Sequence, residues 1–228
     1  MRIKPIIIAI LFITSGIFYY QITEATTDTQ TFQISRIVDG DTVKLTNGAT
    51  LRLLGINTPE KNMPFFQEAT DFLTILIQNK SVQVETHGTD RYGRTLSYIF
   101  LNDENVNKQI LTQGLATLYY YDKDSHYEEL KQAEEFARLN RKALWKKSPD
   151  ENCIKLIQFK TDEPEKLVLQ NECDKQINIT FKDDATHIYK ETLEPKSTLT
   201  KSFSHIWNTN GDSLYVRDKQ GLLIFYRY

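Results

Sequence analysis

Apolar and polar residues alternate along short stretches of the chain from residue 32 onward, which is typical of β-strands with one buried face. Two of these stretches flank Asn47-Gly48, a dipeptide that predicts a hairpin with a two-residue turn. In the first half of the chain the predicted strands cover residues 32–38, 42–45, 49–55, 81–85 and 95–101.

Three helices are predicted among these strands, because apolar residues there recur at three- and four-residue spacing. The first follows Pro64, which suits the first helical position, and the second is capped by Asn105. The third begins at Ser125, with Glu128 completing a capping box, and continues to about Trp145. Five short strands and three helices predict an α+β fold built on a small barrel.

The helical spacing disappears beyond Ser-Pro-Asp at residues 148–150, which predicts a boundary between a first domain at 32–147 and a second at 152–228. The second domain has the composition of an Ig-like β-sandwich. Its predicted strands cover residues 154–159, 166–170, 176–181, 213–217 and 222–226.

Two cysteines lie symmetrically about the first turn of this second domain. With residues 162–164 as the turn, Glu163 is the midpoint, and Cys153 and Cys173 each lie ten positions from it. The even separation puts them on one face of a hairpin, opposite each other. In an oxidising compartment that pairing favours a disulfide. Two free buried thiols are the alternative.

The N-terminal segment has the pattern of an export signal. Arg2 and Lys4 precede an uncharged, mostly apolar run at residues 5–22. That run is nearly long enough to span a bilayer core of about 30 Å. The sequence around Ala25 makes a poor cleavage site, so a cleaved signal and a retained membrane anchor both stay open. Either way residues 1–27 predict a signal or anchor with a tether, and a remainder that faces the outside.

The charge balance excludes a bulk-basic nucleic-acid binder. Among 228 residues the chain has 28 Lys and Arg against 30 Asp and Glu, a net charge of −2. Contacts to phosphate must therefore come from local geometry. Two cysteines and four scattered histidines cannot build a cysteine-rich zinc module, which leaves carboxylates and hydroxyls as ligands for a hard cation.

Four stretches of the first domain bring chemically active residues together, at residues 39–42, 52–60, 90–94 and 107–121. Each stretch alone is explained by a turn, a helix approach or a charged loop. Together they supply what phosphodiester hydrolysis needs, because the substrate is an anion that gains charge in the transition state.

The candidate roles follow from residue chemistry. Asp41 with oxygens at residues 57–58 could hold a cation that neutralises the phosphate and positions water. Arg52 and Arg94 offer planar guanidinium groups that bind phosphate oxygens in pairs. The Glu60 carboxylate could orient the water or take its proton.

Three segments resemble the staphylococcal nuclease (thermonuclease) family: Asp-Gly-Asp-Thr at 39–42, Arg-Leu-Leu-Gly-Ile-x-Thr-Pro-Glu at 52–60 and Arg-Tyr-Gly-Arg at 91–94. The resemblance runs from about residue 32 to 145 without large gaps, and Asn107 extends it. It implies an OB-type five-stranded barrel with three helices. The implied activity is calcium-dependent cleavage of DNA and RNA that leaves 3′-phosphate ends.

The resemblance also implies which residues meet the substrate. Arg52 and Arg94 correspond to the phosphate-binding arginines of the family, and Glu60 to its water-orienting carboxylate. Tyr92 and Tyr120 fall where the family has tyrosines that contact the nucleotide.

On the metal side, the resemblance implies Asp41 as a ligand, Thr58 as a backbone carbonyl ligand and Asp39 in the outer shell. Where the family usually carries a second metal-binding Asp, this chain has Asn57. An amide oxygen can coordinate calcium, but the site loses one negative charge. We therefore expect calcium to bind more weakly than at a site with two Asp ligands.

Three other residues of the first domain have an ordinary structural interpretation. His126 is predicted to be a surface residue in the first helical turn, and Asp122 and Asp124 to be solvated loop residues.

The end of the chain, residues 207–228, resembles a lamin-tail domain, and it carries no catalytic set. It is expected either to stabilise the first domain or to adhere to substrate, envelope or a protein partner. The leading functional hypothesis is an exported calcium-dependent nuclease acting on DNA and RNA. The alternative is a catalytically weak or inactive nucleic-acid-binding barrel. Glu60 favours the enzyme, because a carboxylate would repel a phosphate that is only bound.

Overall fold

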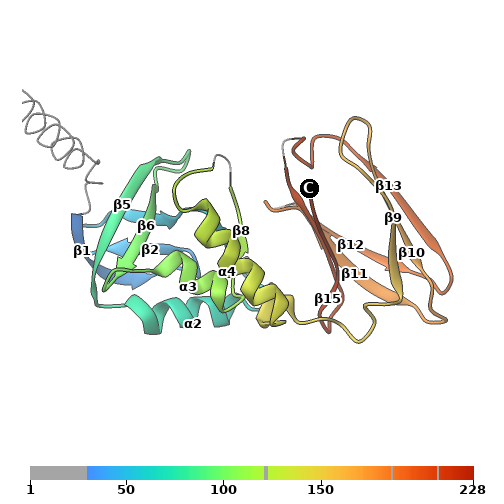
Figure 1. The fold of residues 1–228 in the computed structure, drawn as a ribbon, viewed down its shortest axis with the longest axis horizontal. Helices are drawn as coiled ribbons and strands as arrows, with labels where there is room; N and C mark the ends of the chain where they lie inside the picture. The colour runs from blue at the N-terminus through green and yellow to red at the C-terminus, as the bar shows by residue number, and fades with distance from the viewer. Residues whose placement is uncertain (1–29, 121–122, 186, 210) are drawn as a thin grey trace, which may run out of the picture.

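The computed structural model describes residues 30–120, 123–185, 187–209 and 211–228. The predicted export segment, residues 1–27, lies outside them. Among the described residues no helix is long and apolar enough to cross a membrane. Figure 1 shows two β-rich parts side by side, with the C-terminal end of the chain on the side of the second part that is nearer to the first.

The first part is a closed barrel, which confirms the predicted α+β, OB-type fold. Its strands follow the order β3-β2-β1-β5-β6 with antiparallel neighbours, and β3 pairs with β6 in parallel to close it. Ile34, Val43 and Leu53 point into the barrel and are fully buried. The five strands are β1 (Gln30–Ile37), β2 (Thr42–Leu45), β3 (Thr50–Leu53), β5 (Ser81–Thr89) and β6 (Thr95–Leu101).

The hairpin between β2 and β3 differs from the prediction of a two-residue turn. Lys44 pairs with Thr50, and the Leu45 amide donates to the Ala49 carbonyl at 2.9 Å, so three residues form the loop. Gly48 occupies the last loop position at φ 88°, a conformation that glycine adopts without steric cost. Three two-residue strands were not predicted: β4 (Ile56–Asn57), β7 (Glu104–Asn105) and β8 (Thr117–Leu118).

Three helices accompany the barrel, as predicted: α2 (Phe66–Ile77), α3 (Val106–Thr112) and α4 (Tyr127–Leu139). The Asn105 side chain caps α3 by accepting from the Lys108 amide at 3.1 Å, which confirms that cap. Pro64 is not the first residue of α2, because Phe65 between them adopts a left-handed conformation at φ 69°.

The predicted ends of the third helix were wrong. The helix begins at Tyr127 with His126 as its N-cap residue and has no side-chain cap, so Ser125 is not the cap; the His126 amide donates to Asp124 at 2.9 Å. The helix ends at Leu139 because Arg141 takes φ 53°, and the chain continues as the 3-10 turn η1 (Ala143–Trp145). The predicted continuation to Trp145 therefore joined two separate elements.

The second part is a β-sandwich of two sheets, with orders β13-β10-β9 and β12-β11-β14-β15. Its core lies between the sheets and includes Leu167, Phe181 and Val216. β12 and β13 were not predicted, because they are edge strands with many exposed polar positions. The strands are β9 (Ile154–Lys160), β10 (Glu165–Asn171), β11 (Ile177–Lys182), β12 (Ile188–Leu193), β13 (Thr198–Phe203), β14 (Ser213–Arg217) and β15 (Leu222–Arg227).

The disulfide between Cys153 and Cys173 is present, as predicted. The register near the turn is symmetric about Glu163, with Lys160 opposite Lys166. A β-bulge near Val168 then shifts the register by one residue, so the two cysteines are offset rather than directly opposite. Their Cα atoms are still 5.2 Å apart, within the range that a disulfide bridges.

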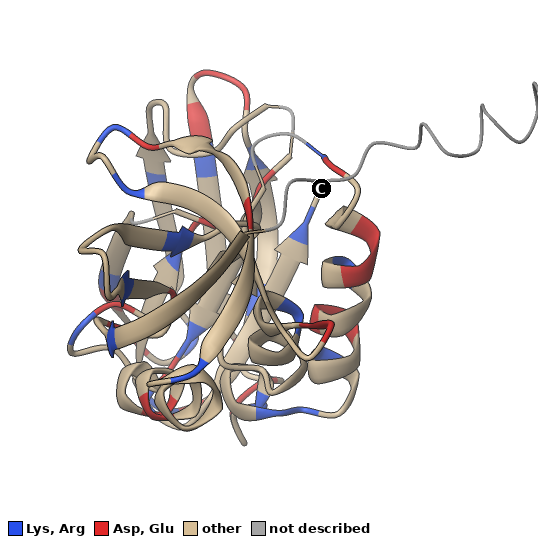
Figure 2. Ribbon diagram, turned by 90° about the vertical axis from the view of Figure 1, so that its left-hand side faces the viewer, with Lys and Arg blue, Asp and Glu red and all other residues tan. Residues whose placement is uncertain are grey.

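A small apolar cluster joins the barrel to the outer face of the four-stranded sheet. Trp145 is fully buried there, with its ring 6.0 Å from that of Tyr215 and 5.0 Å from that of Phe225. An ion pair between Arg227 on β15 and Glu134 on α4 adds a polar connection. Figure 2 shows basic and acidic residues interspersed over the molecule seen from the barrel end, as the balanced net charge predicts.

Candidate active site

The Asp41 carboxylate is the centre of a hydrogen-bonded cluster at one end of the barrel. Its Oδ2 accepts from the backbone amide of Thr58 at 2.9 Å and from the Thr58 hydroxyl at 2.8 Å. Its Oδ1 accepts from Thr42 at 3.2 Å and lies 3.3 Å from Nε of Arg52. Asp39 accepts from the Asp41 amide at 3.1 Å, and burial together with the Asp41 charge raises the pKa of Asp39.

Local structure explains why these groups meet. The antiparallel register of β2 and β3 sets Thr42 beside Arg52. The chain before Asp41 passes so close to α2 that a Cβ on Gly40 would lie 2.7 Å from Cβ of Ala69, a distance that real Cβ atoms essentially never show. Glycine at this position therefore lets the Asp-Gly-Asp turn pack against the helix.

Arg52 is held by the protein in several directions. Its guanidinium donates to the carbonyls of Leu53 and Ile56, the second at 2.9 Å, and to Oδ1 of Asn57 at 3.3 Å. The side chain is 12% exposed. Arg52 is thus pre-organised beside Asp41, with little freedom to reorient.

Arg94 approaches the same cluster from the loop between β5 and β6. Its Nε donates to Asp90 Oδ2 at 2.7 Å, and its Nη1 lies 3.5 Å from the Thr42 hydroxyl. Burial opposes ionisation of Asp90, but hydrogen bonds from Arg94 outweigh it and lower the pKa of Asp90. The Tyr92 ring lies 5.5 Å from the Arg94 guanidinium carbon and is 69% exposed, so it is available to solvent and ligands.

Asn57 connects the cluster to the sandwich. Its Oδ1 faces Arg52, and its Nδ2 donates to the backbone carbonyl of Asp184 at 3.1 Å. Asp184 follows β11, so a loop of the C-terminal part reaches the barrel at the predicted metal-ligand position. No local pattern predicts this contact, because 127 residues separate the two positions.

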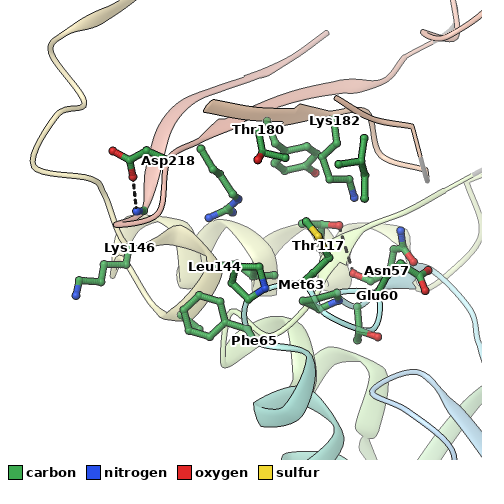
Figure 3. Close-up of a pocket in the computed structure, with 18 of the residues that line it drawn as sticks. Asn57, Glu60, Met63, Phe65, Thr117, Leu144, Lys146, Thr180, Lys182 and Asp218 are labelled. Carbon is green, nitrogen blue, oxygen red and sulfur yellow. Dashed lines mark hydrogen bonds between the residues drawn. The ribbon is translucent and has the colours of Figure 1, made fainter. Parts of the chain in front are cut away.

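Glu60 lines a cleft of about 300 Å³ between the barrel and the sandwich. Asn57 and Thr58 share the barrel wall with it. Figure 3 shows Asn57, Glu60 and Thr117 on the barrel side of this cleft, and Thr180 and Lys182 opposite them on the sandwich. The site candidates from residues 39–60 thus form one continuous region, with Arg94 and Tyr92 beside it.

Tyr120 has a different environment from the other candidates. Its hydroxyl lies 2.5 Å from that of Tyr98, and both hydroxyls donate to Asp124 at 2.7 Å. Burial and the Asp124 hydrogen bond raise the pKa of Tyr120. The prediction that Asp124 is a solvated loop residue was wrong, because it joins the two tyrosines to the start of α4.

The prediction that His126 is a surface residue was also wrong. Its side chain is 16% exposed and lies between two carboxylates. Nδ1 is 2.9 Å from Glu129 and Nε2 is 3.2 Å from Glu85. Burial lowers the pKa of His126, but the two carboxylates outweigh it, and the net effect is a raised pKa. His126 connects α4 to β5 and lies outside the Asp41 cluster.

The oxygens near Asp41 suit a hard cation in their chemistry. They are one carboxylate, the amide oxygen of Asn57 and the carbonyl of Thr58, which are ligand types that calcium accepts. Among the described residues no three His, Cys, Asp or Glu side chains form a metal-binding group. The Asp41 oxygens already accept from Thr58 and Thr42. The ligand types available at residues 41, 57 and 58 are thus ones that calcium accepts, with one carboxylate among them.

The fold and cluster define an OB-type barrel with an arginine–carboxylate site at one end. The family model described as "Staphylococcal nuclease homologue" matches residues 50–147. The chain is 31% identical over 152 residues to the thermonuclease of Staphylococcus hyicus, covering 61% of this chain and 90% of that protein. It is 34% identical over 137 residues to an uncharacterized endonuclease of Haemophilus influenzae, covering 58% and 74%.

A third relative is the SPbeta prophage-derived endonuclease YokF of Bacillus subtilis, 32% identical over 129 residues, which are 50% of this chain and 44% of that protein. The family model covers the barrel from β3 onward, including Arg52, Glu60 and Arg94, and begins after Asp41. The chain belongs to the staphylococcal nuclease family, and the relatives support a nuclease.

Proposed function

We propose that this protein is an exported, calcium-dependent nuclease that hydrolyses phosphodiester bonds of DNA and RNA and leaves 3′-phosphate ends. The observation that carries the proposal is the single cluster formed by Asp41, Arg52 and Thr58, with Arg94 3.5 Å from Thr42 at its edge. Together these groups offer fixed cations for a phosphate and hard oxygens for a metal.

In this mechanism Arg94 binds the non-bridging oxygens of the scissile phosphate, and both arginines stabilise the charge that grows there. Arg94 retains donors directed away from Asp90, and Arg52 acts as a fixed positive charge beside Asp41. Glu60 orients a water molecule and accepts its proton. The water oxygen bonds to phosphorus as the P–O5′ bond breaks, and solvent protonates the leaving O5′.

Calcium would be held by Asp41, Asn57 and Thr58 and would supply further positive charge to the phosphate. Because only one of these three ligands, Asp41, is a carboxylate, we expect activity to need calcium near the millimolar level. Export is consistent with that level and with the Cys153–Cys173 disulfide.

The test is cleavage of single-stranded DNA and of RNA by the purified full chain, with calcium varied from micromolar to about ten millimolar and a chelator as the reference. Glu60→Gln and Arg94→Gln should each lower the rate by about 10²-fold or more, because each removes a group that acts on the reacting atoms. End-group analysis of the products should find 3′-phosphates.

Two substitutions serve as matched controls. Glu68→Gln changes an exposed glutamate on α2, and Arg36→Gln an exposed arginine on β1; neither should alter the rate. Binding of DNA without cleavage at every calcium concentration would refute the enzyme and favour the alternative of a binding barrel. Tight calcium binding in the micromolar range, measured by calorimetry without nucleotide, would refute the role assigned to Asn57.

A further inference from the structure

The cleft beside Glu60 has a wall that the family resemblance does not cover. Its barrel wall includes Glu60 and Thr117, and its other wall comes from the sandwich, with Thr180, Lys182 and Arg217. The volume of about 300 Å³ is at the lower end of the range for ligand sites. The C-terminal part is therefore a structural component of the region around the candidate catalytic carboxylate.

Lys182 and Arg217 reach this cleft because of strand alternation. On the paired strands β11 and β14, Thr180 lies opposite Arg217 and Lys182 opposite Tyr215. Side chains two residues apart share a face, so all four belong to the outer face of the sheet. Tyr215 on that face contacts Trp145 of the barrel side, which shows that the face is directed toward the barrel.

Arg217 is a partly buried cation, and the described ranges give it no protein partner. Among the described residues no hydrogen bond or ion pair involves its guanidinium, although the side chain lines the cleft. Burial lowers the pKa of Arg217 to about 10. Placing an unpaired cation in such a site is unfavourable unless an anion joins it.

Lys182 is a second cation of the cleft. Its ammonium lies 5.5 Å from the centre of the Tyr215 ring and forms no ion pair within the described part of the chain. Figure 3 shows Lys182 extending from the sandwich toward the barrel wall that carries Asn57 and Glu60. Burial lowers the pKa of Lys182, although nearby carboxylates, Glu60 among them, act in the opposite direction.

The acidic residues of the sandwich near this cleft are already engaged. Asp184 accepts from the hydroxyls of Tyr215 and Ser213 at 2.7 and 3.0 Å. Asp218 accepts from Ser148 at 2.5 Å and from the amide of Gly221 at 2.8 Å. Neither is paired with Arg217, so the sandwich wall offers two cations to a ligand.

We propose that Lys182 and Arg217 bind a second phosphate of the nucleic-acid strand, next to the phosphodiester that is cleaved beside Glu60. This inference rests on the proposed nuclease function and extends its substrate site onto the C-terminal sandwich. A guanidinium fork together with an ammonium suits the tetrahedral phosphate group, and a strand repeats that group at every nucleotide. A substrate with only one phosphate would not use these two residues.

The test compares two thymidine probes on the full chain: a single-stranded octamer and a dinucleotide with a single phosphodiester. Arg217→Gln and Lys182→Gln should each raise the Kd for the octamer, measured by fluorescence anisotropy with chelator present, by roughly tenfold to a hundredfold. Each should also reduce the slope of log K against log salt by about 0.7. The rate of dinucleotide cleavage in calcium should stay within twofold of the wild-type rate.

The matched control is Lys155→Gln, which neutralises an exposed lysine on β9 that does not line the cleft. It should leave the Kd for the octamer and the salt slope unchanged. Arg217→Lys keeps the positive charge and should recover part of the affinity. Thermal melting establishes that each variant is folded. Because an unpaired, partly buried cation adds little to stability, Arg217→Gln should melt no lower than the wild type.

Octamer binding by Arg217→Gln and Lys182→Gln equal to that of Lys155→Gln would overturn the second phosphate site and leave the nuclease proposal standing. If Arg217→Gln and Lys182→Gln lose dinucleotide cleavage as strongly as they lose octamer binding, the two residues act at the scissile phosphate. That result would also overturn the second phosphate site. If the wild type cleaves neither probe but the variants lose octamer affinity, the phosphate site stands and the proposed hydrolysis fails.

Discussion

The ion pair between Glu134 and Arg227 holds the sandwich against α4, and with it the geometry of the cleft. Glu134 is 2% exposed, and its Oε1 accepts from the Leu118 amide at 2.7 Å and from Arg227 at 3.2 Å. Arg227 also donates to the Ser213 hydroxyl at 2.7 Å. Arg227→Met would leave the Glu134 carboxylate buried and without its cation.

The expected cost follows from that burial. Removing one partner of a buried ion pair typically destabilises a protein by about 3–5 kcal/mol, because the remaining charge is uncompensated. The Arg227 side chain is 26% exposed, so water can relieve part of this penalty and we expect about 3 kcal/mol. Glu134→Gln should cost less, because its amide oxygen still accepts from Leu118 and Arg227 retains Asp184 at 3.8 Å.

The assay is a double-mutant cycle by urea unfolding, with Arg227→Met, Glu134→Gln and the double variant. The double variant should lose less unfolding free energy than the two single variants lose together, by a coupling free energy of about 2 kcal/mol. Purely additive effects, or a cost below about 1 kcal/mol for Arg227→Met, would refute the view that this pair holds the two parts together.

Three further outcomes are expected. Because the pKa of His126 is raised in the folded protein, its stabilising contribution is present below about pH 6.5 and is lost as pH rises through the folded-state pKa. Over that pH window the urea midpoint should fall more for the wild type than for His126→Gln. Parallel curves of midpoint against pH would contradict this. Replacing Cys153 and Cys173 together with Ser should lower the free energy of unfolding by about 3 kcal/mol, because the bridge closes a loop of 20 residues in the unfolded chain; an unchanged urea midpoint would count against it. Gly40→Ala should cost about 1–3 kcal/mol by forcing the turn away from Ala69, and an unchanged melting temperature would show that the turn adjusts freely.

Much of the barrel was predictable because its strands and helices are encoded by short-range patterns. Thr42–Leu45 and Thr95–Leu101 were predicted with their observed bounds, and the Asn105 cap was correct. Alternation and capping depend on residues within a few positions of one another, so one sequence is sufficient to find them. The Asp41 cluster was anticipated in a different way, from residue chemistry and from the resemblance of residues 39–42 and 52–60 to the staphylococcal nuclease family.

The errors occurred where tertiary contacts outweigh local pattern. His126 looked like a surface residue because its partner Glu85 lies on a strand 41 positions earlier. The edge strands β12 and β13 escaped prediction because their exposed faces leave little apolar alternation. The bulge at Ile157 in β9 shifted the cysteines by one residue, which a symmetric hairpin does not anticipate.

The sequence by itself determined that this chain forms a barrel followed by a β-rich region, and that the barrel carries arginines and carboxylates suited to a phosphodiester. Only the tertiary structure decided which face of the sandwich meets the barrel. That choice brings Lys182 and Arg217 into a cleft with Glu60, over separations of more than 100 positions. Alternation can assign two side chains to one face of a sheet, but what that face packs against depends on the summed burial of surfaces from distant segments.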